Sequence, residues 1–330
     1  MAAGRTMRII TAALLVAPTL ALAQAPQTGW KPDKPVELVV GAAPGGANDR
    51  IGRSLQRLLQ ELKLANTVII NNKPGGGQAV AFSYLNTHPG NPHFLGLASS
   101  SWLTTVAAGR GTITPRDVTP IVKFLDEYQV YFVRADSPIA NAKDIVDRLK
   151  KDPGSLSFGF STAAGNPLHI SIATLARQAG ADPAKVKAVV FNSGTDTALQ
   201  VAGGHLDVGV QSPGSAAQMF QAGRIRIIAV AAPKRHPGAL AHIPTLREQG
   251  INVDANVFYT MFGPKGLDAA QTAYWDQAIT RAMQSPEVKK DAELNYWTID
   301  FIGHRELPAF LERENEAYKR ALADIGLLKQ

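Results

Sequence analysis

Hydrophobic positions along this chain alternate between short continuous runs and helical stripes. The segment "VELVV" (36–40) is an apolar run typical of a buried strand. The helix that follows it shows one apolar face, made by Ile51, Leu55, Leu58, Leu59 and Leu62. The same alternation continues as far as "FYTMFG" (258–263) and predicts an α/β fold with largely parallel strands.

The pattern also predicts where the chain changes character. We expect strands at 36–40, 67–72, 93–99, 128–134, 156–161, 188–192, 206–211, 226–232, 256–263 and 297–303. Three helical stretches, 269–284, 286–295 and 306–326, surround the last strand. Ser285 and Pro286 predict a helix start, with the serine as cap and the proline in the first turn. No linker rich in Pro, Gly or Ser separates independent domains, so a chain with two lobes would cross between them on strands.

The first residues do not fit this alternation. Arg5 and Arg8 precede an apolar run that closes on Ala21-Leu22-Ala23. This is the form of a secretory signal peptide, and we expect residues 1–23 to be removed by cleavage after Ala23. A permanent membrane anchor is disfavoured, because the run is shorter than the roughly 20 residues that span a bilayer.

Composition narrows the compartment and the class of partner. The formal charge of +7 falls to +5 without Arg5 and Arg8 (7 − 2 = 5), since no acidic residue lies before Gln24. The basic residues are dispersed, which argues against nucleic acid and favours small anions. The absence of cysteine excludes disulfides and thiolate sites and suits an export destination in the periplasm. The seven histidines show no metal-binding spacing, so we expect no metal and no cofactor.

The turn "GAAPGGANDR" (41–50) joins the first strand to the first helix. It is not a Walker loop, because no Lys followed by Ser or Thr comes after Gly46, and it lacks the G-x-G-x-x-G spacing of a dinucleotide site. The amino end of a helix still offers free N–H groups and positive potential, so this turn can receive a carboxylate. The alternative is a plain helix start capped by Asn48 or Asp49.

Two later turns repeat the arrangement. "STAAGNP" (161–167) follows a strand, and Asn166 and Pro167 predict the start of a helix. Ser193 and Asp196 match a capping box after the next strand. Three such turns at the carboxyl ends of strands, directed at one crevice, would suit a ligand with two or more carboxylates.

A catalytic interpretation has less support. The nucleophile elbow G-x-S-x-G is missing around Ser161, since Gly159-Phe160-Ser161 is followed by Thr162 and Ala163. His169 lies on the predicted helix after this turn, where a capping or packing role competes with a role as base. An exported hydrolase using Ser161 or Ser193 with a histidine is retained as an alternative to a binding protein.

The ordered segments resemble a known family, the periplasmic substrate-binding proteins of tripartite tricarboxylate transporters, often called Bug-type receptors. The resemblance rests on "KPVELVVGAAPGGANDRIGR", "VIINNKPGGGQAVA", "FGFSTAAGNPLH", "VVFNSGTDTALQVAGGHLDVGVQSPGSAAQMF" and "FYTMFGPKG". It implies an α/β, two-lobed periplasmic-binding-protein fold of type II-like topology, with mostly parallel sheets, flanking helices and a ligand cleft between the lobes. Lobe 1 would contain 30–132 and 257–330, lobe 2 would contain 133–256, and the crossing strands would lie near Tyr131 and Tyr259. The closing helices would pack back on lobe 1.

The resemblance also implies a receptor rather than an enzyme. Its expected ligand is a small organic carboxylate, with citrate or another di- or tricarboxylate first and an aromatic carboxylate second. Its expected partners are the integral-membrane permease subunits of a tripartite transporter, the receptor itself being a monomer. A sensory receptor for a two-component system is the alternative. The implied ligand-binding residues are Pro44, Gly45, Gly46, Asn48, Asp49, Ser100, Ser161, Thr162, Ala163, Ala164, Gly165, Asn166, Asn192, Ser193 and Gln211.

The chain departs from the family pattern at two places near the expected cleft. Phe191-Asn192-Ser193 stands where many members have an aromatic residue, Lys and Gly, and Gln211-Ser212 stands where they have Asp-Asn. Without that lysine and that acid, the ligand of a relative cannot be carried over to this chain.

Overall fold

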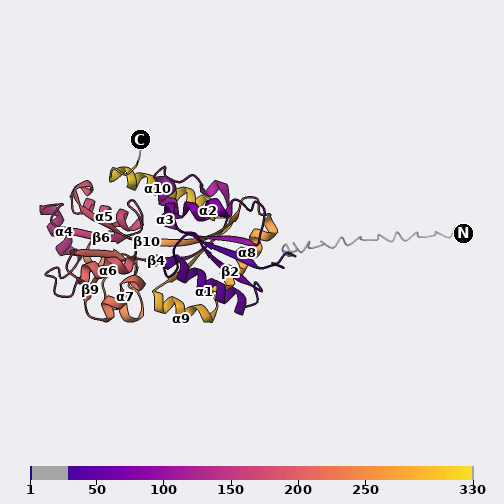
Figure 1. Cartoon of the computed structure of the whole chain (residues 1–330), viewed down its shortest axis with the longest axis horizontal. Coiled ribbons are helices and arrows are strands. Elements are labelled where there is room, and N and C mark those ends of the chain that lie inside the picture. The colour runs from indigo at the N-terminus through magenta and orange to yellow at the C-terminus, as the bar shows by residue number, and fades with distance from the viewer. Residues whose placement is uncertain (2–28, 329–330) are drawn as a thin grey trace.

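The computed structural model describes residue 1 and residues 29–328, and these fold into two mixed β-sheets flanked by helices (Figure 1). We call the six-stranded sheet with its helices lobe 1 and the five-stranded sheet with its helices lobe 2. The predicted signal peptide lies, except for Met1, outside the described residues. The predicted two-lobed α/β fold is confirmed.

Lobe 1 is built on a sheet of strand order β11-β4-β10-β3-β1-β2. The strand β1, next to the edge strand β2, pairs in parallel with β2 and β3, whereas β10, β4 and β11 join in antiparallel fashion. The sheet is therefore mixed rather than mostly parallel. The strands are β1 (Val36–Val40), β2 (Val68–Asn72), β3 (Phe94–Ser99), β4 (Val118–Tyr128), β10 (Asn256–Pro264) and β11 (Thr298–Gly303).

Helices cover both faces of this sheet because each carries one apolar stripe. On one face, α1 (Ala47–Glu61) and α8 (Ala269–Met283) contribute to a core cluster with β1 and β4. On the other, α2 (Ala79–Leu85), α3 (Ser100–Ala107) and α10 (Leu307–Asp324) form a second cluster around Trp102 and Phe262. The helix α9 (Pro286–Asn295) lies beside α1 (Figure 1). Short 3₁₀ helices occur at η1 (Gly76–Gln78) and η2 (Pro115–Asp117).

Lobe 2 has strand order β7-β6-β8-β5-β9, with β6 parallel to β7 and β8, and β5 antiparallel to β8 and β9. Its strands are β5 (Val130–Arg134), β6 (Ser157–Ser161), β7 (Lys187–Phe191), β8 (Val208–Gln211) and β9 (Ile225–Val230). The helices α4 (Ala142–Lys151) and α5 (Pro167–Gln178) cover one face, and α6 (Gly194–Ala202) and α7 (Pro213–Gln221) cover the other. Its 3₁₀ helices are η3 (Pro183–Lys185), η4 (Gly238–Leu240) and η5 (Arg247–Gln249).

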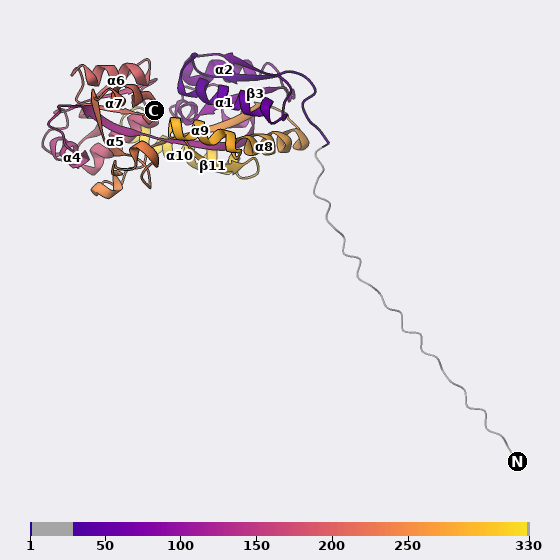
Figure 2. The same ribbon diagram turned by 90° about the horizontal axis from the view of Figure 1, so that it is seen from below.

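The chain passes between the two sheets where three segments meet (Figure 2). The strand β4 ends in the first sheet at Tyr128, and β5 begins in the second at Val130. At this junction the Gln129 N–H donates to Ala255 O at 2.9 Å, and Ala231 N–H donates to Gln129 O at 2.8 Å. Ala255 N–H in turn donates to Ala231 O at 2.9 Å. These backbone hydrogen bonds hold the segments around Gln129, Ala231 and Ala255 side by side. The lobe boundaries expected from the sequence stay a prediction.

The sequence pattern failed to predict β4, which spans eleven residues. Its interior contains Pro120, Lys123, Asp126 and Glu127, and such residues argue against a central strand when read alone. In the folded chain, Lys123 Nζ bonds Asp126 Oδ2 at 2.6 Å and Asp300 Oδ2 at 2.5 Å. Lys123 is thus paired with Asp126 of its own strand and with Asp300, which only the tertiary fold brings near.

Two further expectations about the C-terminal helices are modified. The helix α9 begins at Pro286 as predicted, but the Ser285 hydroxyl donates to Ala282 O and makes no side-chain cap. The helix α10 packs on lobe 1 as expected, and its last turn also reaches lobe 2, where Leu322 contacts the cluster that includes Ala173. None of the helices in the described part of the chain is long and apolar enough to cross a bilayer.

Candidate functional site

The predicted binding residues lie on turns that follow the parallel strands of the two sheets. Residues 44–49 follow β1 and Ser100 follows β3, both in lobe 1. Residues 161–166, 192–193 and 211 follow or end β6, β7 and β8 in lobe 2. The carboxyl ends of parallel strands, next to the point where strand order reverses, are where open α/β sheets bind ligands.

The turn after β1 (the β1–α1 turn) is closed by a hydrogen bond to the side chain of Asp49. Gly45 has φ +83°, a left-handed conformation that favours glycine, and the Gly46 N–H donates to Ala43 O at 3.3 Å. The Gly45 N–H donates to Asp49 Oδ2 at 2.8 Å. The N-cap of α1 is Gly46, so the expectation that Asn48 or Asp49 caps the helix is wrong: Asp49 reaches back beyond the cap instead.

Asp49 is a buried carboxylate with all of its partners in lobe 1. Besides Gly45 N–H, it accepts from Arg53 Nε at 2.8 Å and from Asn72 Nδ2 at 2.9 Å. Burial would raise the pKa of Asp49, but the hydrogen bonds from Arg53, Gly45 and Asn72 outweigh it and lower the pKa below its ordinary value. Asp49 is therefore an ionised part of the turn, and its oxygens are already occupied.

The amino end of α1 is left without a side-chain cap. The N–H groups of Ala47, Asn48 and Asp49 have no acceptor among residues 29–328. By contrast, α4 is capped by Asn141 and α8 by Asp268. Free amides at the positive end of a fifteen-residue helix can bind a carboxylate.

A buried amide side chain supports this part of lobe 1. Gln78 Oε1 accepts from Asn48 Nδ2 at 3.3 Å and from Ser99 N–H at 3.1 Å, and Gln78 Nε2 donates to Ser99 Oγ at 2.7 Å. Asn48 is thus brought next to the end of β3, while Ser100 is fully buried at the start of α3. Gln78 was not predicted, although its position after three glycines (75–77) is a signal that could have drawn attention to it.

The turn after β6 (the β6–α5 turn) reproduces the first turn in lobe 2. Gly165 also has φ +83°, and the Asn166 N–H donates to Ala163 O at 3.3 Å. The N-cap Asn166 has φ −72° and ψ 172°, against −71° and 172° for Gly46. As predicted, Asn166 caps α5, accepting from His169 N–H at 3.0 Å, with Pro167 in the first turn.

Strain and support in this second turn are concentrated at Thr162. Thr162 has φ +78°, which is costly for a β-branched residue, by roughly 1–3 kcal/mol. Its N–H donates to Phe191 O at 2.9 Å and its hydroxyl accepts from Asn166 Nδ2 at 2.8 Å. Ala164 is exposed in this turn, and its N–H has no acceptor among the described residues. The turn therefore presents a free backbone donor to solvent.

The remaining lobe 2 residues form a support chain beneath the turns. The Ser161 hydroxyl donates to Gln211 Oε1 at 3.0 Å, and Gln211 Nε2 donates to Thr197 Oγ1 at 3.0 Å. Ser193 caps α6 by accepting from Asp196 N–H at 3.0 Å, which is one half of the predicted capping box, and Asn192 is exposed. No hydrogen bond joins either serine hydroxyl to a histidine within residues 29–328.

Two charged residues beside these turns, Arg50 and Glu127, were not predicted. Arg50 Nη1 donates to Gly45 O at 3.1 Å, while Arg50 Nη2 is buried with no hydrogen-bond acceptor in the described chain. A Cβ atom placed on Gly214, at the start of α7, would lie 3.6 Å from this Nη2, so the guanidinium spans from lobe 1 to lobe 2. Glu127 is buried nearby and accepts from Tyr259 at 3.1 Å. Burial raises the pKa of Glu127, and Arg50 opposes that rise.

Lobe 1 contacts the β6–α5 turn through residues that lie outside the β1–α1 turn. No hydrogen bond joins residues 44–49 to 161–166 in the part of the chain that the structure describes. Arg110, which follows α3 in lobe 1, donates to Ala164 O in lobe 2 at 3.4 Å. Leu322 of α10 also lies against Gly165. Arg110 and Leu322 therefore link lobe 1 to the β6–α5 turn, and the β1–α1 turn takes no part in these two contacts.

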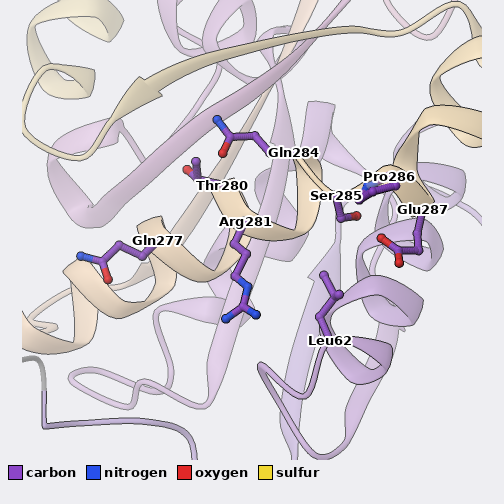
Figure 3. A pocket seen from close by; sticks show the side chains of 8 residues that line it. All are labelled: Leu62, Gln277, Thr280, Arg281, Gln284, Ser285, Pro286 and Glu287. Carbon is purple, nitrogen blue, oxygen red and sulfur yellow. The ribbon is translucent and has the colours of Figure 1, made fainter.

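A pocket of about 460 Å³ lies elsewhere, between the end of α1 and the junction of α8 with α9 (Figure 3). Arg281 extends into it toward Leu62, and the other lining side chains are mostly polar. It contains none of the predicted binding residues. The exposed position of Arg281 and the lack of a buried polar anchor make this hollow a weaker candidate than the turns.

Comparison with known proteins agrees with the two-lobed fold. A family model described as "Tripartite tricarboxylate transporter family receptor" matches residues 51–320. A UPF0065 protein of Cupriavidus necator, from the gbd 5' region, is 25% identical over 320 residues, covering 97% of this chain and 95% of that one. Among solved structures, R. palustris Rpa4515 with adipate has a TM-score of 0.78 at 20% identity, covering 89% of this chain and 98% of that one. MatC from Rhodopseudomonas palustris with bound malate has a TM-score of 0.73 at 18% identity, covering 88% and 99%. The family match confirms the resemblance and a receptor rather than an enzyme.

Proposed function

Because this chain belongs to the tripartite tricarboxylate transporter receptor family, we propose that it captures a small di- or tricarboxylate between its lobes and delivers it to a membrane permease. Citrate is the first ligand to test and aromatic carboxylates are the second class. The receptor would act in the periplasm after cleavage behind Ala23. Closure of the lobes around the ligand would be the signal that the permease recognises.

The observation that carries this proposal is the uncapped amino end of α1. Its three free N–H groups and the helix dipole favour one carboxylate, and the exposed Ala164 N–H of lobe 2 supplies a donor on the other side. Exclusion of water on closure strengthens such bonds. Rpa4515 and MatC, named with adipate and malate, are similar folds associated with carboxylates.

Arg50 supports a ligand with more than one carboxylate. Its Nη2 is buried without an acceptor among the described residues, next to the amino end of α7, where the Ser212 side chain makes no cap. Two sources of positive potential then meet at one point, and a second carboxylate would neutralise both. Glu127 is buried nearby and Arg50 opposes the rise in its pKa, but no salt bridge joins Glu127 to Arg50 within residues 29–328.

A thermal-shift screen tests the proposal. The panel contains citrate, malate, adipate and aromatic carboxylates, with the matched alcohols as controls for the carboxylate group. A ligand at a hundredfold excess over its Kd stabilises the folded state by about 2.7 kcal/mol, which raises the melting temperature measurably. If every carboxylate leaves the melting temperature unchanged, the receptor proposal is wrong.

A matched variant tests the second carboxylate. In Arg50→Gln, the Gln side chain keeps part of the packing and removes the charge. We expect its affinity for a dicarboxylate to fall by about tenfold or more, and its affinity for the corresponding monocarboxylate to change far less. Equal losses for both ligands would contradict a role for Arg50 at a second carboxylate. Uptake of labelled ligand by cells with and without the receptor tests delivery to the permease and separates transport from sensing.

A further inference from the structure

The β1–α1 and β6–α5 turns differ in the side-chain atom that accepts a hydrogen bond from the glycine N–H. In both, the N–H of the left-handed glycine is bound by the side chain four residues later. In lobe 1 that acceptor is the carboxylate of Asp49, at 2.8 Å from Gly45 N. In lobe 2 it is the imidazole of His169, with Nδ1 at 3.1 Å from Gly165 N. The same turn is therefore closed by an ionised acid on one side and by a titratable ring on the other.

The hydrogen bond to Gly165 fixes the state of the ring. Because Nδ1 accepts, the proton of the neutral imidazole is on Nε2. Stacking against Phe160, with ring centroids 4.9 Å apart and planes at 22°, holds the ring in this orientation. A protonated imidazole carries hydrogen on both nitrogens, so it would set an N–H against the Gly165 N–H and lose the bond.

We propose that His169 is a positioning residue for ligand capture: its neutral ring holds the β6–α5 turn in the binding conformation, and its protonation releases the turn and weakens carboxylate binding. This inference rests on the proposed function for its consequence, but the link between His169 and Gly165 stands on the geometry of the turn. The residue affected is Ala164, whose free N–H lies directly before Gly165.

Lobe 1 does not share this sensitivity. The pKa of Asp49 lies below its ordinary value, so the β1–α1 turn keeps its acceptor throughout the range in which a histidine titrates. Burial lowers the pKa of His169, which places the release of the turn on the acid side of an ordinary histidine. Acidification would then loosen one half of the site and leave the other intact.

Charged and titratable groups on several elements surround His169, and two opposing effects set how ligand affinity changes with pH. Arg110, after α3, contacts Ala164 O of the same turn, and Asp324 of α10 pairs with Arg177 farther along α5. Tyr131 of β5 is bonded to Ser171 on the next part of α5, and burial is the cause of the pKa shift of His169. A protonated ring would also attract an anionic ligand directly. Loss of the turn predicts weaker binding in acid, whereas direct attraction predicts stronger binding.

The first test uses the ligand-free protein. In a ¹⁵N NMR titration of the full mature chain, we expect a neutral His169 with hydrogen on Nε2. The amide signal of Gly165 should move with the same midpoint as the His169 ring, while the amide of Gly45 should not move in that range. A Gly165 amide that ignores the titration of His169 would overturn the proposal, whatever ligand the protein binds.

The second test measures Kd for the carboxylate that gives the largest thermal shift, from about two pH units above to about two below the ordinary histidine pKa of ~6.5. His169→Asn supplies a neutral acceptor of the length that Asp49 uses in lobe 1, and His169→Leu supplies none. His205→Gln, at an exposed histidine of lobe 2, is the control. Ratios between variants at the same pH remove the titration of the ligand itself.

We expect wild-type affinity to fall by about five- to tenfold more than that of His169→Asn on acidification, which is the value of about one hydrogen bond. His169→Leu should bind weakly at every pH, and His205→Gln should follow the wild type. Parallel pH profiles for wild type and His169→Asn, or tighter wild-type binding in acid, would overturn the proposal. If the wild type binds none of the carboxylates, the proposed function fails and the capture role of His169 fails with it, while the NMR titration still decides whether the ring holds the turn.

Discussion

Replacing Gly46 by Asn should separate stability from binding at the amino end of α1. Gly46 has almost the same backbone angles as Asn166, so an Asn at this position can cap α1 as Asn166 caps α5. The new Oδ1 would accept from Asp49 N–H, one of the amides without an acceptor among residues 29–328. The stability gain of Asn over Gly at an N-cap is a few tenths of a kcal/mol, so the melting temperature should rise by about 1 °C.

The same cap should cost affinity. A hydrogen bond between an N–H group and a carboxylate is worth about 1.5–3 kcal/mol, so losing one donor should weaken binding about ten- to hundredfold. Isothermal titration calorimetry with the carboxylate from the thermal screen measures this, and thermal unfolding measures the cap. Gly46→Ala is the control, because it adds a Cβ but no hydrogen-bond acceptor for the amides. The added Cβ would lie 3.3 Å from Ala43 O. A Gly46→Asn protein that melts higher and still binds like the wild type would refute the role of these amides.

Three further predictions concern the supports of the site and of the fold. In Asp49→Asn, we expect the free energy of unfolding to fall less steeply in acid than in the wild type. The pKa of Asp49 is lowered in the folded state, so its stabilising contribution is present above its unfolded pKa of about 3.8 and is lost as pH falls through the folded value. Urea unfolding at several pH values measures this difference. In Lys123→Met, two carboxylates including the buried Asp126 lose their cation, and we expect a loss of about 3–5 kcal/mol in the free energy of unfolding. In Ser161→Ala, Gln211 loses a donor, so about 1 kcal/mol of stability should be lost, and an ester-hydrolysis assay should give the same background as wild type; a drop in turnover would instead favour a hydrolase.

The turns could be predicted from sequence because their signals are local. Gly45, Gly165 and Asn166 are residue types that left-handed and N-cap positions select, and they follow apolar runs that form strands. The helix starts at Pro167 and Pro286 were found for the same reason. Local chemistry of this kind is visible without knowing which strands pair.

The features that the sequence did not reveal depend on distant residues. The strand β4 was missed because part of the pairing of Lys123 comes from Asp300, far along the chain, in addition to Asp126 of the same strand. Arg50 resembles any solvated arginine of a first helical turn until α7 is placed against it. The alternative in which Asn48 or Asp49 caps α1 is wrong, because Arg53 and Asn72 direct the Asp49 carboxylate to the Gly45 N–H rather than to the helix end.

The comparison of the two turns explains why a stable protein would keep an imperfect helix end. Lobe 2 satisfies its helix with Asn166, whereas lobe 1 has glycine at the equivalent position and leaves three amides free of acceptors within residues 29–328. A cap would be nearly neutral in strain, since the backbone angles are the same, so its absence is not imposed by geometry. Under the proposed function, the cost of the uncapped end, a few tenths of a kcal/mol, would be small compared with the binding free energy that a carboxylate would gain from the same amides. The free amides at the start of α1 slightly destabilise the ligand-free protein and would be hydrogen-bonded in the liganded one. Such a helix end would favour the closed, liganded form, which is the property that a receptor requires.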